Sequence, residues 1–164
     1  MPSSVPIRAV VITVSDACAR GERQDESGEA LKRLLEEAGS EIVERRVLSD
    51  DLEPLAATLR AYAERADVNL IMTTGGTGLG PRDNTPEATL TTIEREVPGI
   101  AEAIRAESLK FTPMAMISRG ICGVRSGALI VNLPGSPKAV VESFGVIRPV
   151  LKHAIELLAG QTRH

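Results

Sequence analysis

Residues 73–89, TTGGTGLGPRDNTPEAT, combine the residue types of a phosphate-binding loop. Four of them are glycine, and glycine lets the backbone adopt positive φ, so that successive N–H groups can converge on an anion. Thr85 suits the N-cap of a following helix and Pro86 suits its first position, and the unpaired N–H groups of that helix would add to the site. The segment therefore predicts a phosphate site, and the alternative is a glycine-rich connection that binds nothing.

A second segment, NLPGSPKAV at residues 132–140, repeats this order of residue types. An apolar strand is followed by a glycine, by Ser136 as the expected N-cap, and by Pro137 at the first helical position. Two such turns at one edge of a sheet suit a ligand with more than one phosphate. Neither turn is a Walker A loop, because no Gly-Lys-Ser/Thr follows the glycines, and neither has GxGxxG spacing. Arg82 and Lys138 are candidate counter-charges, although Lys138 by itself is better explained as a solvated surface residue.

Carboxylates stand close to the predicted phosphate site, and Asp83 lies inside the first loop. A bare carboxylate would repel a phosphate, but the conflict disappears if Asp83 binds a divalent cation that bridges to the phosphate, as Mg²⁺ does through one or two carboxylates. The alternative is that Asp83 pairs with Arg82 or caps its own loop. Asp50 and Asp51 follow a predicted strand and can equally cap the next helix, and Asp16 can cap a turn.

No side chain stands out as a covalent nucleophile. Neither Cys18 nor Cys122 has a histidine near it in the sequence, and His153 and His164 do not form a metal-binding set. The expected reaction is therefore one that positioning and a metal ion can perform, namely the transfer of a phosphoryl or nucleotidyl group.

Strand-like and helix-like segments alternate along the whole chain. We predict strands at 5–15, 41–48, 69–73, 114–120 and 127–133. We predict helices at 29–39, 52–67, 86–97, 98–111 and 136–160, with Pro149 kinking or splitting the last of them. This alternation implies βαβ units around a mainly parallel sheet in one α/β domain, residues 1–164. In such a sheet, ligands gather at the carboxyl ends of the strands.

The composition excludes several classes of partner. The formal net charge of −3 gives no general field that would attract a polyanion, so any anion site must be local. The chain has only three aromatic residues and no tryptophan, which argues against nucleic-acid binding by base stacking. The N-terminal apolar run is too short to span a bilayer and lacks a signal-peptide layout, and the two cysteines suggest no disulfide framework. We expect a cytoplasmic protein that binds neither nucleic acid nor a membrane.

The two loop motifs, together with TVSD at residues 13–16, resemble those of the MogA/MoaB family of molybdenum cofactor biosynthesis. The motifs occur in the family's order, and the resemblance runs from Ile7 to Leu158. It implies a three-layer α/β/α sandwich and the activity of a molybdopterin adenylyltransferase, which transfers AMP from Mg-ATP to the terminal phosphate of molybdopterin and releases pyrophosphate.

The resemblance also implies roles for individual residues. The residues expected to act in catalysis and to hold Mg²⁺ are Asp83 and Asp50, with Asp51 as the alternative to the second. The residues expected to bind the nucleotide and its phosphates are Gly75, Gly76, Thr77, Gly78, Pro134, Gly135 and Ser136. The residues expected on the pterin side are Ser15, Asp16 and Ser118.

For partners, the resemblance implies molybdopterin and ATP as substrates, a homotrimer or a hexamer, and contact with a molybdenum insertase. Three alternatives to the enzyme remain within related proteins: a module that binds molybdopterin without catalysis, the related domain of molybdenum insertases, and a scaffold. Retention of both Asp83 and the acidic LSDD segment at residues 48–51 favours the enzyme over the binding module.

Overall fold

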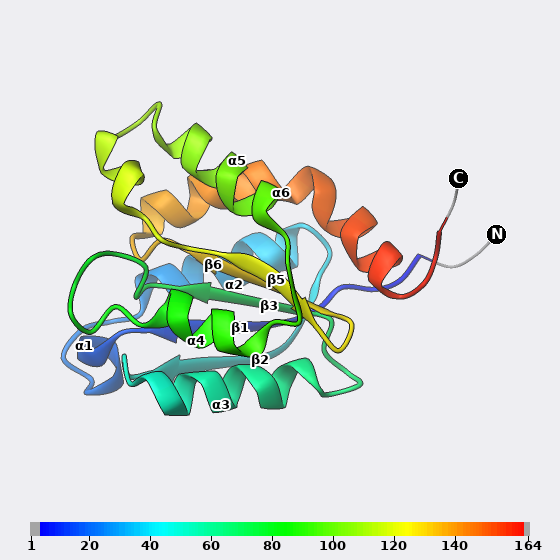
Figure 1. Ribbon diagram of the computed structural model, residues 1–164, viewed down its shortest axis with the longest axis horizontal. Helices are drawn as coiled ribbons and strands as arrows, with labels where there is room; N and C mark the ends of the chain where they lie inside the picture. The colour runs from blue at the N-terminus through cyan, green and yellow to red at the C-terminus, as the bar shows by residue number, and fades with distance from the viewer. Residues whose placement is uncertain (1–3, 163–164) are drawn as a thin grey trace.

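The computed structural model describes residues 4–162 and contains a six-stranded sheet with helices on both faces (Figure 1). The sheet has the order β2-β1-β3-β6-β5-β4. Its parallel strands are β1 (Arg8–Val14), β2 (Glu41–Leu48), β3 (Leu70–Thr74) and β6 (Ala128–Leu133). Its antiparallel strands are β4 (Arg95–Glu96) and β5 (Cys122–Arg125).

Five of the helices form the two outer layers, and α1 (Asp16–Ala19) is a single short turn after β1. On one face lie α2 (Glu26–Glu37), α5 (Pro98–Ser108) and α6 (Pro137–Leu158). On the other lie α3 (Leu52–Ala63) and α4 (Thr85–Thr92). A 3₁₀ turn, η1 (Pro113–Ile117), follows α5. The predicted three-layer α/β/α sandwich around a mainly parallel sheet is confirmed.

Strand β1 shows why the sequence favours this layering. After Arg8 its residues are β-branched or small, and alternate side chains enter opposite cores. Ala9 and Val11 pack with α2 and α6, whereas Val10 and Ile12 pack with α3. A strand that is buried on both faces has no polar side to show to water. A continuous apolar run is therefore the pattern that a central parallel strand requires.

Two predicted elements differ from the structure, and the strands β4 and β5 were not predicted. Residues 114–120 do not form a strand, because Pro113 and the Thr112 hydroxyl, which accepts a hydrogen bond from the Met114 N–H, start the 3₁₀ turn instead. The strand at this place in the sheet is β5, whose sequence CGVR has no apolar run. The helix predicted over 86–97 ends at Thr92, and the residues after Ile93 form β4 against β5.

Helix α6 continues through Pro149 instead of splitting there. Proline removes the backbone hydrogen bond to the residue four positions earlier, here Gly145. The helix survives because residues on both sides of Pro149, Ile147 and Leu151, are anchored in the core.

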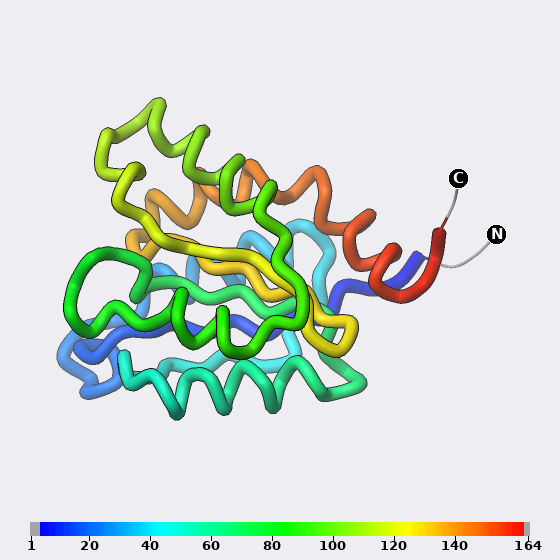
Figure 2. Tube along the Cα trace, viewed as in Figure 1, coloured from blue at the N-terminus to red at the C-terminus, as the bar shows by residue number. Residues whose placement is uncertain are grey.

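The topology places four loops at one end of the molecule. The parallel strands β1, β2, β3 and β6 all finish at this end, and Figure 2 shows their following loops opposite the end where the described chain starts and finishes. No helix within residues 4–162 is both long enough and apolar enough to cross a membrane.

Candidate functional site

A cavity of about 510 Å³ lies at the carboxyl ends of the parallel strands. The residues that line it are Thr13, Val14, Ser15, Cys18, Arg23, Gln24, Glu26, Ser27, Asp50, Thr74, Gly75, Gly76, Asp83, Gly135, Ser136 and Pro137. They come from the last residues of β1 and β3 and from the segments that follow β1, β2, β3 and β6, including the first residues of α2 and α6. We call this space the larger cavity. The cavity therefore lies at the end of the sheet where the ligand was expected to bind.

The first two residues of the glycine loop need to be glycine. Gly75 has φ of 96° and Gly76 has φ of 69°, a region that other residues adopt at a cost. A Cβ atom at Gly75 would lie 2.4 Å from the carbonyl oxygen of Val14, and one at Gly76 would lie 2.3 Å from Thr85 Oγ1. The backbone of this loop thus approaches β1 and α4 more closely than a side chain would allow.

The hydroxyl of Thr85 has a different role from the predicted one. The N-cap of α4 is Asn84, which makes no side-chain capping bond, and Thr85 is the first helical residue. Thr85 is completely buried, its Oγ1 donates to the Gly75 carbonyl oxygen at 2.9 Å, and its N–H donates to the Gly76 carbonyl oxygen at 3.1 Å. Thr85 therefore ties the glycine loop to the start of α4.

The second turn is built as predicted. Ser136 is the N-cap of α6, its Oγ accepts from the Ala139 N–H at 3.2 Å, and Pro137 occupies the first turn of the helix. Within residues 4–162, the backbone N–H groups of Gly76, Gly135 and Ser136 donate to no acceptor. Since all three residues line the larger cavity, these groups are available to an anion there.

Asp16 and Asp50 hold the ends of β1 and β2 together. The Asp16 N–H donates to Asp50 Oδ2 at 2.9 Å, and the Asp50 N–H donates to Asp16 Oδ1 at 3.0 Å. Arg82 then binds the Asp16 carboxylate through two nitrogens, at 2.7 and 3.0 Å, and also binds Asp51 Oδ1 at 3.0 Å. Arg82 is thus paired with Asp16 and Asp51, and not with Asp83.

The two neighbouring carboxylates of the LSDD segment have different surroundings. Asp50 is half-buried and lines the larger cavity. Asp51 is exposed, stands at the N-cap of α3 without a capping bond, and bonds to Arg82 and to Ser49 Oγ. The position of Asp50 is therefore the one that suits a ligand in the cavity.

The pKa values of the carboxylates are shifted in opposite directions. Hydrogen bonds from the Arg82 guanidinium hold the pKa of the Asp16 carboxyl well below its usual range, and they also lower that of Asp51. Burial raises the pKa of Asp50, and the negative charges of Asp16 and Asp83 raise it further. A cation near Asp50 and Asp83 would relieve this repulsion.

Asp83 is turned back toward its own loop and lines the larger cavity. Its Oδ2 accepts from the Gly80 N–H at 2.9 Å, so the predicted alternative, that Asp83 caps its loop, is correct as a description of its contacts. A Cβ atom at either Gly78 or Gly80 would lie 2.9 Å from this oxygen. The two glycines therefore make room for the carboxylate.

The residues present fit a metal ion that takes its other ligands from a phosphate. Asp50 and Asp83 line the same cavity. Within the described part of the chain, no group of three or more His, Cys, Asp or Glu side chains could hold a metal ion by itself. Mg²⁺ is commonly bound by one or two carboxylates together with substrate phosphates and water, which matches this donor set.

A smaller cavity of about 240 Å³ adjoins the same loops. Predicted residues that line it are Thr77, Gly78, Ser118 and Pro134. The other residues that line it are Ile104, Arg105, Ser108, Thr112, Met114, Ala115, Ile117, Ala139 and Glu142. In each turn, one residue lines the larger cavity and its neighbour in the sequence lines the smaller one. The two cavities therefore lie on either side of these turns, and an extended ligand could reach both.

The predicted division into nucleotide and pterin residues does not follow the two cavities. Ser15 lines the larger cavity together with Gly75 and Gly76, whereas Ser118 lines the smaller one together with Thr77 and Gly78. Asp16 lines neither, because its carboxylate is engaged by Arg82 and by the Asp50 N–H.

The sequence patterns did not predict the roles of two arginines near the site, Arg23 and Arg119. Arg23 is the cationic side chain among the residues that line the larger cavity, a place that had been expected for Arg82 or Lys138. Lys138 is exposed and lies 3.8 Å from Glu142. Arg119 binds the glycine loop through its guanidinium. The signal that points to Arg119 in the sequence is its place directly after Ser118, which the family resemblance assigns to the pterin side.

Comparisons with known proteins agree with this geometry. Residues 10–153 match the family described as "Probable molybdopterin binding domain". The chain is 41% identical over 150 residues to the molybdenum cofactor synthesis protein cinnamon of Drosophila melanogaster, covering 90% of this chain but only 25% of that protein. It is 34% identical over 152 residues to a molybdopterin adenylyltransferase of Helicobacter pylori, covering 92% of this chain and 86% of the relative.

The fold is also similar to that of solved structures. The crystal structure of the molybdopterin biosynthesis enzyme MoaB from Thermus thermophilus superposes with a TM-score of 0.88 at 47% identity, and the match covers 94% of this chain and 97% of that one.

Proposed function

Because this chain belongs to the MogA/MoaB family, we propose that it is a molybdopterin adenylyltransferase of molybdenum cofactor biosynthesis. The observation that carries the proposal is the larger cavity itself. It brings Asp50 and Asp83 together with the unpaired N–H groups of two glycine turns, and so it offers a place for a metal ion beside phosphates.

The reaction needs no nucleophile from the protein. An oxygen of the terminal phosphate of molybdopterin would attack the α-phosphorus of ATP, the bond from that phosphorus to the bridging oxygen of the β-phosphate would break, and pyrophosphate would leave. The task of the chain is then to hold two anionic groups in line and to stabilise the charge that develops. The N–H groups of Gly76, Gly135 and Ser136 can donate to phosphate oxygens from fixed positions.

Asp50 and Asp83 would hold Mg²⁺ together with the phosphates of ATP. Bound there, the ion neutralises charge on the phosphate oxygens and acts as a Lewis acid. The burial and like charges that raise the pKa of Asp50 favour such a role, because a divalent cation offsets both.

We propose that Arg23 supplies the positive charge that offsets the charge of the phosphates. Its guanidinium lies 3.4 Å from Ser15 Oγ, and it makes no ion pair within residues 4–162 that would compete with a ligand. Arg82 is committed to Asp16 and Asp51, and so it serves to hold the loops.

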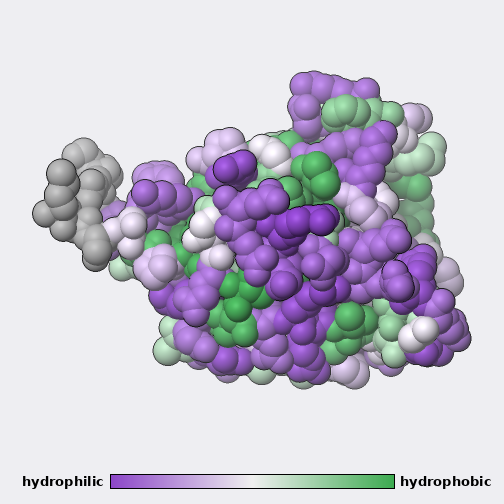
Figure 3. All heavy atoms as spheres, turned by 180° about the vertical axis from the view of Figure 1, so that it is seen from behind, coloured by the Kyte–Doolittle hydropathy of each residue, from purple (hydrophilic) through white to green (hydrophobic). Residues whose placement is uncertain are grey.

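We propose that the chain assembles as a homotrimer, with a hexamer as the alternative. Large apolar side chains are exposed in and beside η1, namely Leu109, Phe111, Met114, Met116 and Ile117. Figure 3 shows a mostly hydrophilic surface with separate apolar patches. The five exposed side chains lie within nine positions of the chain, which makes this segment a candidate for a contact between copies. Sedimentation velocity would measure the assembly, and a monomer at micromolar concentration would contradict it.

The remaining partners follow from the proposed chemistry. The product would carry an activated phosphoanhydride, which suits a molybdenum insertase as the next enzyme. A reaction that consumes ATP also agrees with a cytoplasmic location. Molybdopterin and ATP are the two substrates.

Pyrophosphate release tests the proposal, and the adjacent residues Asp50 and Asp51 provide a matched pair. We expect wild-type protein to release pyrophosphate from Mg-ATP only when molybdopterin is present. Asp50→Asn should reduce kcat/KM on the order of 1,000-fold, because it removes a ligand for a metal that contributes several kcal/mol. Asp51→Asn should remain within about tenfold, since it removes one exposed ion pair.

The opposite outcome would make the chain a binding module. If folded wild-type protein binds molybdopterin tightly and releases no pyrophosphate, adenylyl transfer is excluded. If Asp51→Asn instead of Asp50→Asn abolishes release, the assignment of the second carboxylate is wrong.

A further inference from the structure

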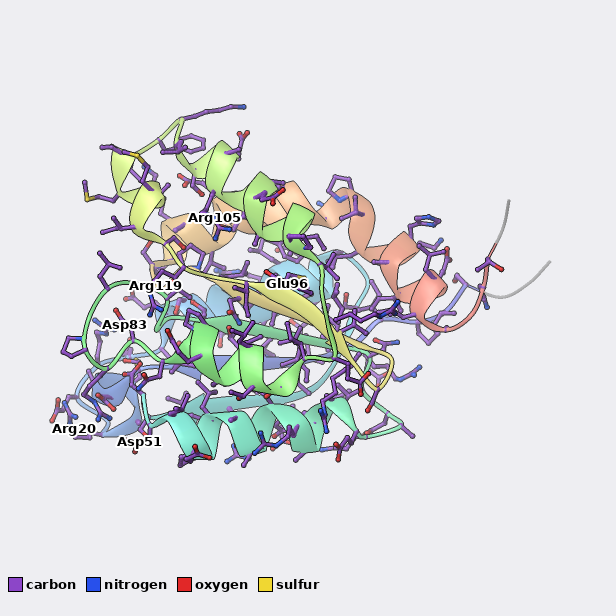
Figure 4. All side chains as sticks on the ribbon, in the orientation of Figure 1. Arg20, Asp51, Asp83, Glu96, Arg105 and Arg119 are labelled. Carbon is purple, nitrogen blue, oxygen red and sulfur yellow. The ribbon has the colours of Figure 1, made fainter. Side chains whose placement is uncertain are left out.

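The guanidinium of Arg119 contacts both ends of the segment that carries Asp83. Its Nε donates to the Gly78 carbonyl oxygen at 2.7 Å, and its Nη2 donates to the Asp83 carbonyl oxygen at 2.7 Å. Its Nη1 pairs with the Glu87 carboxylate in the first turn of α4. Figure 4 shows Arg119 beside Asp83 at the end of the sheet. One planar group therefore fixes three points of the loop and its following helix.

The backbone of Arg119 adds a fourth connection. Its N–H donates to the Thr77 carbonyl oxygen at 2.8 Å. Arg119 lies between η1 and β5, so these bonds tie the glycine loop to the part of the chain that leads into the antiparallel edge of the sheet. The carbonyls of Thr77, Gly78 and Asp83 are thus all turned toward Arg119.

The side chains on either side of Asp83 also hold the loop. Arg82 binds Asp16 and Asp51, and Asn84 Nδ2 donates to the Asp50 carbonyl oxygen at 2.9 Å, but neither bonds to the main chain of Asp83 as Arg119 does.

The internal bonds of the loop are those between Gly80 and Asp83, in which the Asp83 N–H donates to the Gly80 carbonyl oxygen at 3.0 Å and Asp83 Oδ2 accepts from the Gly80 N–H. Leu79, at the tip, is 66% exposed and does not anchor the loop in the core. The backbone position of Asp83 consequently depends on bonds from outside the loop.

We propose that Arg119 is a positioning residue for the metal-binding carboxylate of Asp83. By binding the carbonyls of Gly78 and Asp83 it fixes the ends of the loop, so that the Asp83 carboxylate faces the larger cavity. The planar guanidinium can donate in three directions at once, whereas a lysine ammonium on a flexible chain cannot hold the same three acceptors. The proposal rests on the proposed function, because it assumes that Asp83 binds a metal with ATP.

The test is a double-mutant cycle on metal binding. Binding of Mn²⁺ would be followed by electron paramagnetic resonance in the presence of an ATP analogue that resists cleavage. We expect Arg119→Ala to weaken Mn²⁺ binding about 10–100-fold, as loss of groups that orient metal ligands commonly does. Arg119→Lys should be nearly as weak, because the charge is kept and the geometry is lost.

The double variant distinguishes positioning from a general loss of stability. If Arg119 acts through Asp83, Arg119→Ala combined with Asp83→Asn binds Mn²⁺ no more weakly than Asp83→Asn alone. Glu87→Gln is the matched control, since it removes the ion pair and leaves both carbonyl bonds, and it should change binding less than about fivefold. Circular dichroism and thermal unfolding would confirm that each variant is folded.

Several results would overturn the proposal. Wild-type Mn²⁺ affinity in Arg119→Ala, or losses that add fully in the double variant, would show that Arg119 does not act through Asp83. An effect of Glu87→Gln as large as that of Arg119→Ala would assign the role to the ion pair. If the wild-type protein itself bound no Mn²⁺ with the ATP analogue, the proposed function would fail first, and the role of Arg119 with it.

Discussion

The turn between β3 and α4 and the turn between β6 and α6 look alike in the sequence but differ in the structure. Each joins a buried parallel strand to a helix through glycine, a hydroxyl residue and proline. The exposed Ser136 hydroxyl caps its helix. The buried Thr85 hydroxyl binds the Gly75 carbonyl instead. The same residue order therefore starts a helix in both turns, at the hydroxyl residue in the first and at the proline in the second, whereas burial decides what the hydroxyl does.

The difference in length separates the two turns further. Ten residues lie between Thr74 and Thr85, and three lie between Leu133 and Pro137. The long turn has room for Asp83 and for the two glycines that accommodate its carboxylate, and it is held from outside by Arg119. The short turn offers backbone N–H groups and a helix start. We infer that the long turn carries the chemistry and that the short one provides a fixed wall for the phosphates.

The largest expected contrast between the turns is in activity. Asp83→Asn should lower kcat/KM for pyrophosphate release on the order of 1,000-fold, because a metal ligand is lost from the long turn. Ser136→Ala should stay within about tenfold, because its backbone N–H remains and only the cap is lost. An equal or larger loss in Ser136→Ala would contradict the division of roles.

The next contrast is in stability and concerns the glycines. Gly75→Ala should reduce the free energy of unfolding by about 2–5 kcal/mol, since its φ is positive and the new Cβ would meet the Val14 carbonyl oxygen. Gly135→Ala should lie within about 1 kcal/mol of wild type, because its Cβ would meet only the Gly75 backbone, at 3.3 Å from the Cα, and φ is not positive. Urea unfolding measures both, and similar losses would mean that the two turns are equally tight.

A smaller contrast is expected for the hydroxyls. Thr85→Val keeps the shape of the side chain but leaves the Gly75 carbonyl without this donor, which should cost about 1–3 kcal/mol of unfolding free energy. Ser136→Ala removes an N-cap and should cost about 1 kcal/mol. The prediction would be wrong if Thr85→Val were as stable as wild type while Ser136→Ala was not.

The smallest expected effect is the pH dependence at Asp50, which borders the long turn. Its pKa in the folded protein is raised, so the charged form is disfavoured and the folded state loses stability above that pKa. This loss disappears as the pH falls from the folded pKa to the unfolded value of about 4. Asp50→Asn, which can still accept from the Asp16 N–H, should therefore be at least as stable as wild type at pH 7, and the difference should vanish in acid.

The pH dependence of stability expected from Asp16 has the opposite sign to that expected from Asp50. The pKa of Asp16 is lowered by Arg82, so its contribution stabilises the fold above the unfolded pKa and is lost as the pH falls toward the folded one. Unfolding free energies of Asp50→Asn and Asp16→Asn, measured from pH 7 downward, should change relative to wild type in opposite directions. Parallel curves would contradict the assigned causes of the two shifts.

Local patterns were sufficient to predict much of the fold. The β-branched run of β1 and the Ser136-Pro137 start of α6 were recognisable because their causes lie within a few residues. Strand β5 was missed because CGVR has neither an apolar run nor alternation, and its pairing with β6 and β4 holds it in the sheet. The motif positions predicted that Asp50, Asp83 and the glycines would meet at one edge.

The contacts that arrange the site could not be predicted in this way. Arg82 reaches Asp16 across 66 positions of sequence, and Arg119 reaches Gly78 across 41. No local pattern distinguishes an arginine that binds a substrate from one that holds a loop. Likewise, only the fold separates Asp50, in the cavity, from its exposed neighbour Asp51.

The most direct test of adenylyl transfer is to follow the α-phosphate of ATP. ATP radiolabelled at its α-phosphate would be incubated with Mg²⁺, molybdopterin and either wild-type protein or Asp83→Asn, and the products would be separated. Wild-type protein should transfer the label to molybdopterin in proportion to the pyrophosphate released, and the variant should not. Label that stays in ATP, or that appears as free AMP without labelled molybdopterin, would contradict adenylyl transfer as the function of this cavity.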